Sequence, residues 1–211
     1  MKGPPDMSNL SRRFLMAAAA ATVVLVSACS GETASGGADG EMTLGDPNAP
    51  VKMTEYASLS CSHCADFNNE VFPEFKAKYI DTGKVHYTFK EFLTPPNEVA
   101  AAGFLLARCA GEDKYFNVVD AIFHAQREMF TTGDVRGVLL RVARSAGLSE
   151  EQFNACIQDE EAIKALNARI DKTMRETSIS ATPTFAVNGK VVKEGAMTMQ
   201  ELDAAVAAAM K

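Results

Sequence analysis

Two cysteines separated by two residues are the most reactive feature of this sequence: Cys61 and Cys64 enclose Ser62 and His63. Cysteines at this spacing can close a disulfide within one helical turn. The residues before them predict a strand and those after them a helix, so Cys61 faces the unpaired amide groups and the positive end of that helix. These groups stabilise a thiolate, which is the nucleophile of thiol chemistry, and His63 adds a donor or a positive charge. The motif therefore predicts thiol–disulfide exchange.

The motif has two other interpretations: it could be half of a metal site, or it could form a purely structural disulfide. A zinc or copper site would need further ligands, and His63 or His86 could supply a third. A structural zinc site usually has a second pair of ligands, and the sequence contains no other CxxC or histidine pair. A structural disulfide that closes so short a loop contributes little stability. Redox chemistry is therefore the preferred interpretation.

The elements that must position the motif alternate between strand and helix. Val51–Ala57 predicts a short strand, and the helix that follows it carries apolar residues on one face and is kinked at Pro73. Lys84–Glu91 predicts a second strand, because apolar and polar residues alternate along it. The three elements form one βαβ unit, whose crossover is expected to be right-handed.

The remainder of the domain is predicted to be helical first and then to return to strands. Residues 95–178 have helical periodicity throughout, and Ser149 with Gln152 makes a capping box inside this block. Thr184–Val187 and Lys190–Lys193 then predict a hairpin around an Asn-Gly turn. A final helix follows the hairpin. This order places a helical block between the two halves of a mixed sheet.

The chain resembles the DsbA-like family of the thioredoxin superfamily over residues 43–211. The resemblance rests on the motif from Cys61 to Cys64 after a strand, on the helical insertion, and on Ala181-Thr182-Pro183-Thr184-Phe185 at the start of the hairpin. It implies an α/β, thioredoxin-like fold with an inserted helical domain between the βαβ and ββα halves. The implied boundaries are residues 43–92 and 179–211 for the thioredoxin-like domain and residues 93–178 for the inserted helical domain.

The resemblance also implies a proline in cis beside the motif, Pro183, preceded by Thr182 as a residue that tunes the site. A proline that enters a strand removes a backbone donor and leaves neighbouring groups free for an extended substrate segment. By itself, the pair would indicate an ordinary trans proline at a strand start. The family commonly has proline after the first cysteine, where this chain has Ser62. This departure leaves the strength of oxidation open.

Glu55 lies six residues before Cys61, inside the first strand. The resemblance implies a partly buried carboxylate that accepts the proton of the resolving thiol. A lysine of the next strand often accompanies such an acid; Lys84 is the better match, and Lys90 shares its strand face. An outward-facing strand glutamate is the alternative.

Cys109 and Cys156 each lie on the apolar face of a predicted helix in the inserted block. An additional disulfide within this block occurs in some members of the family, and an oxidising compartment permits it. The resemblance therefore implies a structural disulfide between them. Two buried free thiols are the alternative, because cysteine packs well as a small hydrophobic residue.

The N-terminal part of the sequence has the composition of an export segment. Arg12-Arg13 precedes the apolar run Phe14–Val26, which is too short to span a bilayer comfortably, so residues 1–28 are expected to be a signal peptide of twin-arginine or ordinary type. Cys29 ends a lipobox-like pattern, which predicts an acylated N-terminus, with ordinary signal-peptidase cleavage as the alternative. Residues 29–42 are then expected to form a flexible tether.

These features predict an exported protein dithiol oxidase, extracytoplasmic or periplasmic and lipid-anchored, that needs neither metal nor nucleotide. Its expected partners are unfolded exported proteins with free cysteines and a membrane quinone-coupled reoxidase of the DsbB or vitamin-K-epoxide-reductase type. The net charge of −6 argues against nucleic acid, and a monomer is expected. One rival is a reductase or isomerase of the same fold. The other is a membrane-tethered metallochaperone that binds copper through Cys61, Cys64 and a histidine.

Overall fold

The computed structural model describes residues 35–36 and 40–211. The expected signal peptide, residues 1–28, and the expected lipidation site, Cys29, lie outside the described residues. The elements in chain order are β1 Ser35–Gly36, β2 Met42–Leu44, β3 Val51–Ala57, α1 Ser62–Glu70, α2 Phe72–Phe75, the π-helical turn η1 Lys76–Ile80, β4 Val85–Glu91, α3 Asn97–Cys109, the 3-10 turn η2 Glu112–Lys114, α4 Tyr115–Thr132, α5 Val135–Ser145, α6 Glu150–Gln158, α7 Glu160–Glu176, β5 Thr184–Val187, β6 Lys190–Glu194 and α8 Met199–Ala209.

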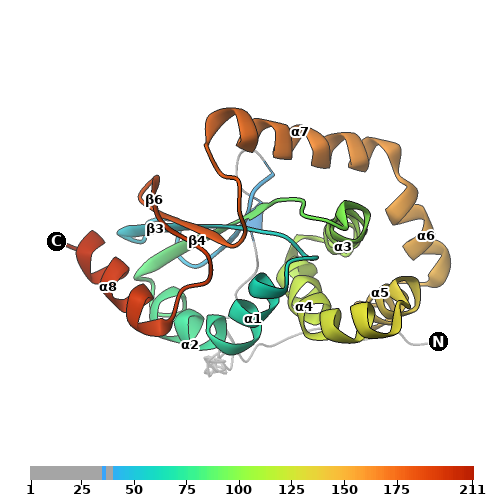
Figure 1. The fold of residues 1–211 in the computed structure, drawn as a ribbon, viewed down its shortest axis with the longest axis horizontal. Coiled ribbons are helices and arrows are strands. Elements are labelled where there is room, and N and C mark those ends of the chain that lie inside the picture. The colour runs from blue at the N-terminus through green and yellow to red at the C-terminus, as the bar shows by residue number, and fades with distance from the viewer. Residues whose placement is uncertain (1–34, 37–39) are drawn as a thin grey trace, which may run out of the picture. The chain divides into compact units, whose positions relative to one another are not determined.

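The strands form one six-stranded mixed sheet in the order β1-β2-β4-β3-β5-β6. β3 and β4 are parallel and are joined through α1 and α2, whereas all other neighbours in the sheet are antiparallel. In Figure 1, α1, α2 and α8 lie on one side of the sheet and α7 lies on the other. The predicted α/β thioredoxin-like fold, with helices inserted between its βαβ and ββα halves, is therefore confirmed.

The first helix is interrupted where the sequence predicts a kink. α1 ends at Glu70, and α2 begins at Phe72 with Pro73 in its first turn, where a missing amide hydrogen costs no helical hydrogen bond. Phe67 of α1 packs on Phe185 of β5, with ring centroids 4.8 Å apart, and Phe72 packs on Tyr87 of β4 at 5.0 Å. These aromatic contacts fix the helix that carries the cysteines to the sheet.

The inserted block consists of α3 to α7, and its helices contact one another in the pairs α3–α4, α4–α5, α5–α6, α3–α6 and α3–α7. The capping box of Ser149 and Gln152 at the start of α6 is confirmed, because each side chain bonds to the backbone of the other residue. α4 also packs against α1, and α7 packs against β4. The block is therefore attached both to the cysteine-bearing helix and to the sheet.

The edge of the sheet near the N-terminus contains two strands that the sequence analysis does not predict. β2 pairs with β4, and β1 pairs with β2. Residues 29–42, expected to be a tether, include β1 and the first residue of β2. Within the part of the chain that the structure describes, no helix combines the length and apolar character needed to span a membrane.

Candidate active site

The two cysteines of the motif differ sharply in exposure. β3 ends at Ala57, a short loop follows, and Cys61 is the residue that caps the start of α1. Cys61 is half-buried, whereas Cys64, one helical turn inside, is fully buried. Both are free thiols, so the structure describes the reduced site. Of the two sulfurs, that of Cys61 is the one that a substrate can reach.

The surroundings of Cys61 stabilise its thiolate. The hydrogen bond from the Cys64 thiol is the largest effect that lowers the pKa of Cys61, and the backbone amides of Cys64 and His63 add to it, against an opposing effect of burial. The resulting pKa of Cys61 is about 5, compared with an ordinary value of 9.0. Since no side chain caps this helix, its first amide groups are available to the sulfur. Cys61 is therefore a thiolate at neutral pH.

Cys64 has the opposite character. Burial raises its pKa well above 9.0, and the hydrogen bond to Cys61 and the nearby Glu55 raise it further. A thiol that resists ionisation needs a proton whenever its sulfur is released from a disulfide. The motif thus combines a stable thiolate at Cys61 with a protonated sulfur at Cys64.

Thr182 and Pro183 lie beside Cys61 although 121 residues separate Thr182 from it. The Thr182–Pro183 peptide bond is cis. When it is protonated, Cys61 Sγ donates a hydrogen bond of 3.3 Å to the backbone oxygen of Thr182. The Thr182 hydroxyl is buried without another hydrogen-bond partner among the described residues, so it can donate to the thiolate and contributes to the lowered pKa of Cys61. This juxtaposition arises because β5, which begins at Thr184, pairs with β3.

Glu55 is buried in β3, 2% exposed, and so the outward-facing alternative is wrong. Burial raises its pKa to about 8, while a hydrogen bond of 2.6 Å from the Tyr87 hydroxyl to Oε2 opposes that rise and the Cys61 charge adds to it. The expected lysine partner is also wrong. Lys84 lies over the Tyr79 ring, and Lys90 pairs with Glu41.

The partner of Glu55 follows from strand register. In the parallel pair β3–β4, Met53 lies opposite Tyr87 and Glu55 lies opposite Phe89. Side chains in register share a face of the sheet, and successive residues alternate between faces. Tyr87 therefore shares the face of Glu55, whereas Lys90, an odd number of positions away, points to the opposite face. Tyr87 is a site residue that the sequence analysis misses.

His63 lies at the surface of the motif. Its side chain is 76% exposed, and Nδ1 lies 4.0 Å from the Asp66 carboxylate one turn further along α1. The contact of His63 with the Cys61 sulfur is made by its backbone amide. A role of the imidazole at the thiolate therefore stays a prediction.

Gln126, in α4 of the inserted block, is a second residue that the sequence analysis misses. Its buried amide donates hydrogen bonds to the backbone oxygens of Leu59, at 2.9 Å, and Cys61, at 3.1 Å. One polar residue on an amphipathic helix gives no sequence signal for such a contact. The helical block thereby holds the loop that carries the reactive cysteine.

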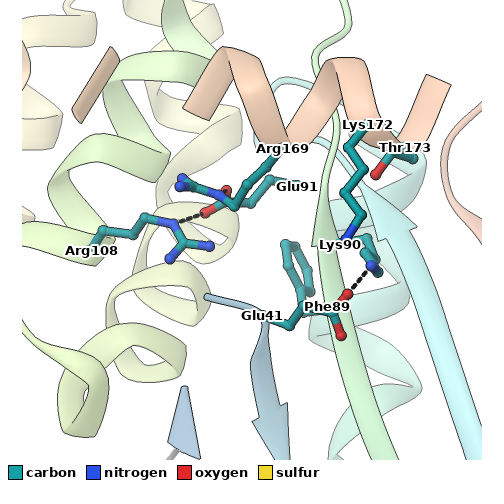
Figure 2. A pocket seen from close by; sticks show the side chains of 8 residues that line it. All are labelled: Glu41, Phe89, Lys90, Glu91, Arg108, Arg169, Lys172 and Thr173. Atoms are coloured by element: carbon teal, nitrogen blue, oxygen red, sulfur yellow. Dashed lines mark hydrogen bonds and ion pairs between the residues drawn. The ribbon is translucent and has the colours of Figure 1, made fainter. Parts of the chain in front are cut away.

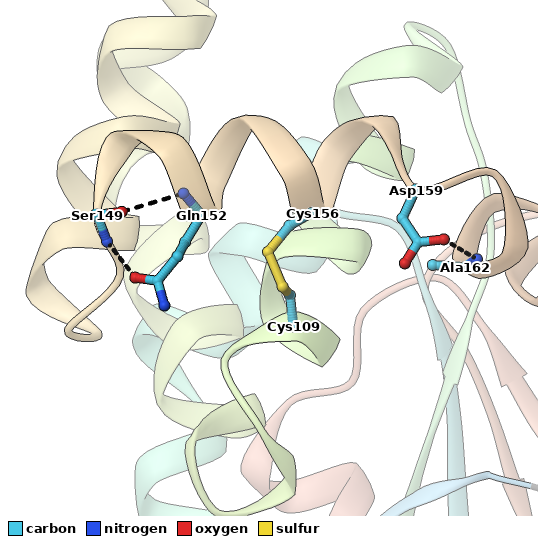
Figure 3. Close-up of a disulfide and its surroundings, with 6 residues drawn as sticks. All are labelled: Cys109, Ser149, Gln152, Cys156, Asp159 and Ala162. Carbon is cyan, nitrogen blue, oxygen red and sulfur yellow. Dashed lines mark hydrogen bonds between the residues drawn. A yellow bond between two sulfur atoms is a disulfide. The ribbon is translucent and has the colours of Figure 1, made fainter.

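Cys109 and Cys156 form a disulfide between α3 and α6, with Cα atoms 5.9 Å apart (Figure 3). Cys156 lies near the end of the helix that Ser149 caps. The carboxylate of Glu91 accepts hydrogen bonds from Nε of Arg108, the residue before Cys109, at 2.6 Å, and from Arg169 Nε, at 2.9 Å (Figure 2). These contacts join α3 and α7 to the end of β4.

Over residues 35–36 and 40–211, no three histidine, cysteine, aspartate or glutamate side chains converge as a metal site would require. The arrangement at Cys61 is suited to nucleophilic attack and to disulfide formation with Cys64.

Comparison with known proteins identifies the family. Residues 38–208 match the family model described as thioredoxin. The crystal structure of α-DsbA1 from Wolbachia pipientis is 30% identical and superposes with a TM-score of 0.69, covering 81% of this chain and 92% of that chain. The chain belongs to the DsbA-like family of the thioredoxin superfamily.

Other DsbA-like relatives differ in length. A predicted protein-disulfide oxidoreductase of Rickettsia conorii is 31% identical over 174 residues, which are 82% of this chain and 61% of that protein. The chain spans between 55% and 61% of the length of the Rickettsia relatives that it matches. Disulfide bond formation protein D of Bacillus subtilis is 26% identical over 161 residues, 73% of this chain and 70% of that protein.

Proposed function

We propose that this protein is a thiol–disulfide oxidoreductase that introduces disulfides into exported proteins through Cys61 and Cys64. The observation that carries the proposal is the stabilised thiolate of Cys61, with a pKa of about 5, next to a buried partner sulfur. A stabilised thiolate favours the reduced protein, and this makes the Cys61–Cys64 disulfide oxidising. The family membership and the names of the relatives support the same chemistry.

The reaction begins with the oxidised protein. A substrate thiolate attacks Cys61, a mixed disulfide forms, and Cys64 leaves with the electron pair of the broken bond. A second substrate thiolate then attacks the substrate sulfur and releases Cys61 as its thiolate. The substrate is oxidised by two electrons and the protein is reduced by two. Thr182 and Pro183 border Cys61 on the side where an extended substrate segment would lie.

The direction of electron flow and the cellular context belong to the proposal as well. A membrane quinone-coupled reoxidase of the DsbB or vitamin-K-epoxide-reductase type would restore the disulfide. The work would take place outside the cytoplasm, with export directed by residues 1–28 and lipid attached at Cys29. A reductase would need a Cys61 thiolate less stable than the one described.

Trapping of mixed disulfides tests the assignment of the two cysteines. Cys64→Ser is expected to accumulate mixed disulfides through Cys61, because the internal route that releases the substrate is lost. Cys61→Ser is expected to accumulate none, and replacement of Cys109 and Cys156 by alanine serves as the control for loss of two cysteines elsewhere. The adducts are identified by mass spectrometry after alkylation. Trapping through Cys64 in the Cys61→Ser variant would overturn the assignment.

A further inference from the structure

Tyr87 and Glu55 form a buried pair beneath the cysteines. The Tyr87 hydroxyl donates to Glu55 Oε2 at 2.6 Å, and both side chains are almost completely removed from solvent. The register of the strands directs both toward the sheet face on which Phe67 of α1 packs on Phe185 and Phe72 of α2 packs on Tyr87. Within residues 35–36 and 40–211, Glu55 has one neutral donor and no cationic partner, so no cation holds it permanently ionised and it is able to exchange a proton.

Building on the proposed disulfide exchange, and on the proton exchange with the resolving thiol that the family resemblance implies for Glu55, we propose that Tyr87 is a positioning residue for Glu55. When a substrate thiolate attacks Cys61, the Cys61–Cys64 bond breaks and its electron pair remains on Cys64 Sγ. The Glu55 carboxyl proton passes to that sulfur and leaves a carboxylate, which solvent later reprotonates. The Tyr87 hydroxyl holds the carboxyl group in one orientation and stabilises the carboxylate as it forms.

The electrostatic surroundings of the pair fit this role. Among the described residues, the titratable groups that act most strongly on Glu55 and Tyr87 are Cys61 before α1, Cys64 of α1 and Tyr115 of α4, and none of these is a cation. Burial raises the pKa of Glu55 to about 8, so Glu55 holds its proton at neutral pH. A lysine in place of Tyr87 would favour the ionised carboxylate and remove that proton. A phenol supplies a donor without adding a charge.

Tyr87→Phe tests the proposal, with Tyr115→Phe as the matched control. Phenylalanine keeps the ring that packs on Phe72, so the fold is expected to persist. Tyr115 is also a fully buried tyrosine whose hydroxyl donates to a buried glutamate, Glu91, at 3.1 Å. The measurement is the rate at which each oxidised protein oxidises a reduced dithiol peptide between about pH 6 and pH 10, by acid quench and mass spectrometry, corrected for the thiolate fraction of the peptide.

For the wild type, the corrected rate is expected to fall as Glu55 loses its proton, with a midpoint well above the ordinary value of 4.5, because burial is the largest cause of the raised pKa and persists in the oxidised protein. Tyr87→Phe should lower the rate at neutral pH about tenfold, because the forming carboxylate loses a charge-assisted hydrogen bond. It should also move the midpoint to higher pH, since the Tyr87 hydrogen bond lowers the pKa of Glu55. Glu55→Gln should abolish the midpoint, and adding Tyr87→Phe to it should change the rate no further.

The control separates this role from a structural one. Tyr115→Phe should reduce stability as much as Tyr87→Phe and leave both the rate and the midpoint unchanged. If Tyr87→Phe has the same rate and midpoint as Tyr115→Phe, Tyr87 does not position Glu55 for proton transfer. A wild type that does not oxidise the peptide at all would refute the proposed function itself, which is a different result.

Discussion

Two glutamates are buried at the sheet, Glu55 within β3 and Glu91 at the end of β4. Glu91 accepts hydrogen bonds from the guanidinium groups of Arg108 and Arg169 and from the Tyr115 hydroxyl. In the part of the chain that the structure describes, Glu55 accepts a hydrogen bond from the Tyr87 hydroxyl alone, and its pKa is raised to about 8. Burial is therefore common to both, and the difference lies in charge compensation.

The comparison distinguishes a structural carboxylate, Glu91, from a reactive carboxyl group, Glu55. A buried carboxylate paired with cations is stable as a charge, and removing one partner is strongly destabilising. A buried carboxylic acid without a cation keeps a proton that it can exchange near neutral pH. Glu91 thus links the helical block to the sheet, whereas Glu55 provides a proton beneath the cysteines.

Glu55→Gln is expected to have the largest effect on the free energy of unfolding, and the size of this effect depends on pH. The folded pKa of about 8 lies above the ordinary value of 4.5, so the native state keeps a proton that the unfolded state has lost between these values. The wild type therefore loses stability as pH rises from 4.5 to 8, by up to about 5 kcal/mol. Over the same pH range, the free energy of unfolding of Glu55→Gln, measured with urea, should rise by that amount relative to that of the wild type. If the free energy of unfolding depends on pH in the same way for both proteins, Glu55 is ionised throughout this pH range.

Removal of the disulfide tests whether the Glu91 region is purely structural. A bond between residues 47 positions apart stabilises by about 4 kcal/mol in the chain-entropy model, less any strain. Alanine at both Cys109 and Cys156 should lower the melting temperature markedly, and dithiol oxidation by Cys61 and Cys64 should persist. A changed redox equilibrium with glutathione in this variant would mean that the two regions are coupled.

Glu91→Gln is the substitution matched to Glu55→Gln, with the opposite sign expected. The loss of charge leaves Arg108 and Arg169, both largely buried, without their counterion, and we expect a destabilisation of about 3 kcal/mol. Chemical denaturation at neutral pH measures it, and the rate of dithiol oxidation should not change. If Glu91→Gln stabilises the protein as Glu55→Gln does, charge compensation does not distinguish the two glutamates.

The smallest effect is expected at His63. An exposed imidazole stabilises a nearby thiolate weakly, because solvent screens the interaction. His63→Ser should raise the pKa of Cys61 and lower the reduction potential by at most about 20 mV, which corresponds to about 1 kcal/mol for a two-electron couple. Equilibration with glutathione measures the potential. A much larger shift would place the imidazole in direct contact with the thiolate in solution.

The sequence predicts those parts of the fold that local patterns determine. Val51–Ala57 and Thr184–Val187 are strands with the predicted bounds, because apolar runs between turn residues are local signals. β2 is missed, since three residues are too few to establish a period, and its pairing with β4 is a tertiary contact.

The candidate site shows the same division. Cys61 and Cys64 are recognisable from their spacing alone, whereas the partner of Glu55 depends on the register between two strands. Lys84 and Lys90 are plausible in sequence, and only the pairing of Met53 with Tyr87 reveals which side chain shares the face of Glu55. Gln126 reaches the loop from a helix about 65 residues away in sequence, a contact that no local pattern encodes.

The distance of 121 residues between Cys61 and Thr182 has a consequence for how the protein acquires its reactivity. Ribosomes make a chain from its N-terminus, so both cysteines and Glu55 exist well before β5 is synthesised. β5 pairs directly with β3, so the neighbours of the Cys61 sulfur are incomplete until the C-terminal strands join the sheet. An unfinished chain therefore lacks the contribution of Thr182 to the lowered pKa of Cys61, and the thiolate gains its full stabilisation only when the last part of the chain folds.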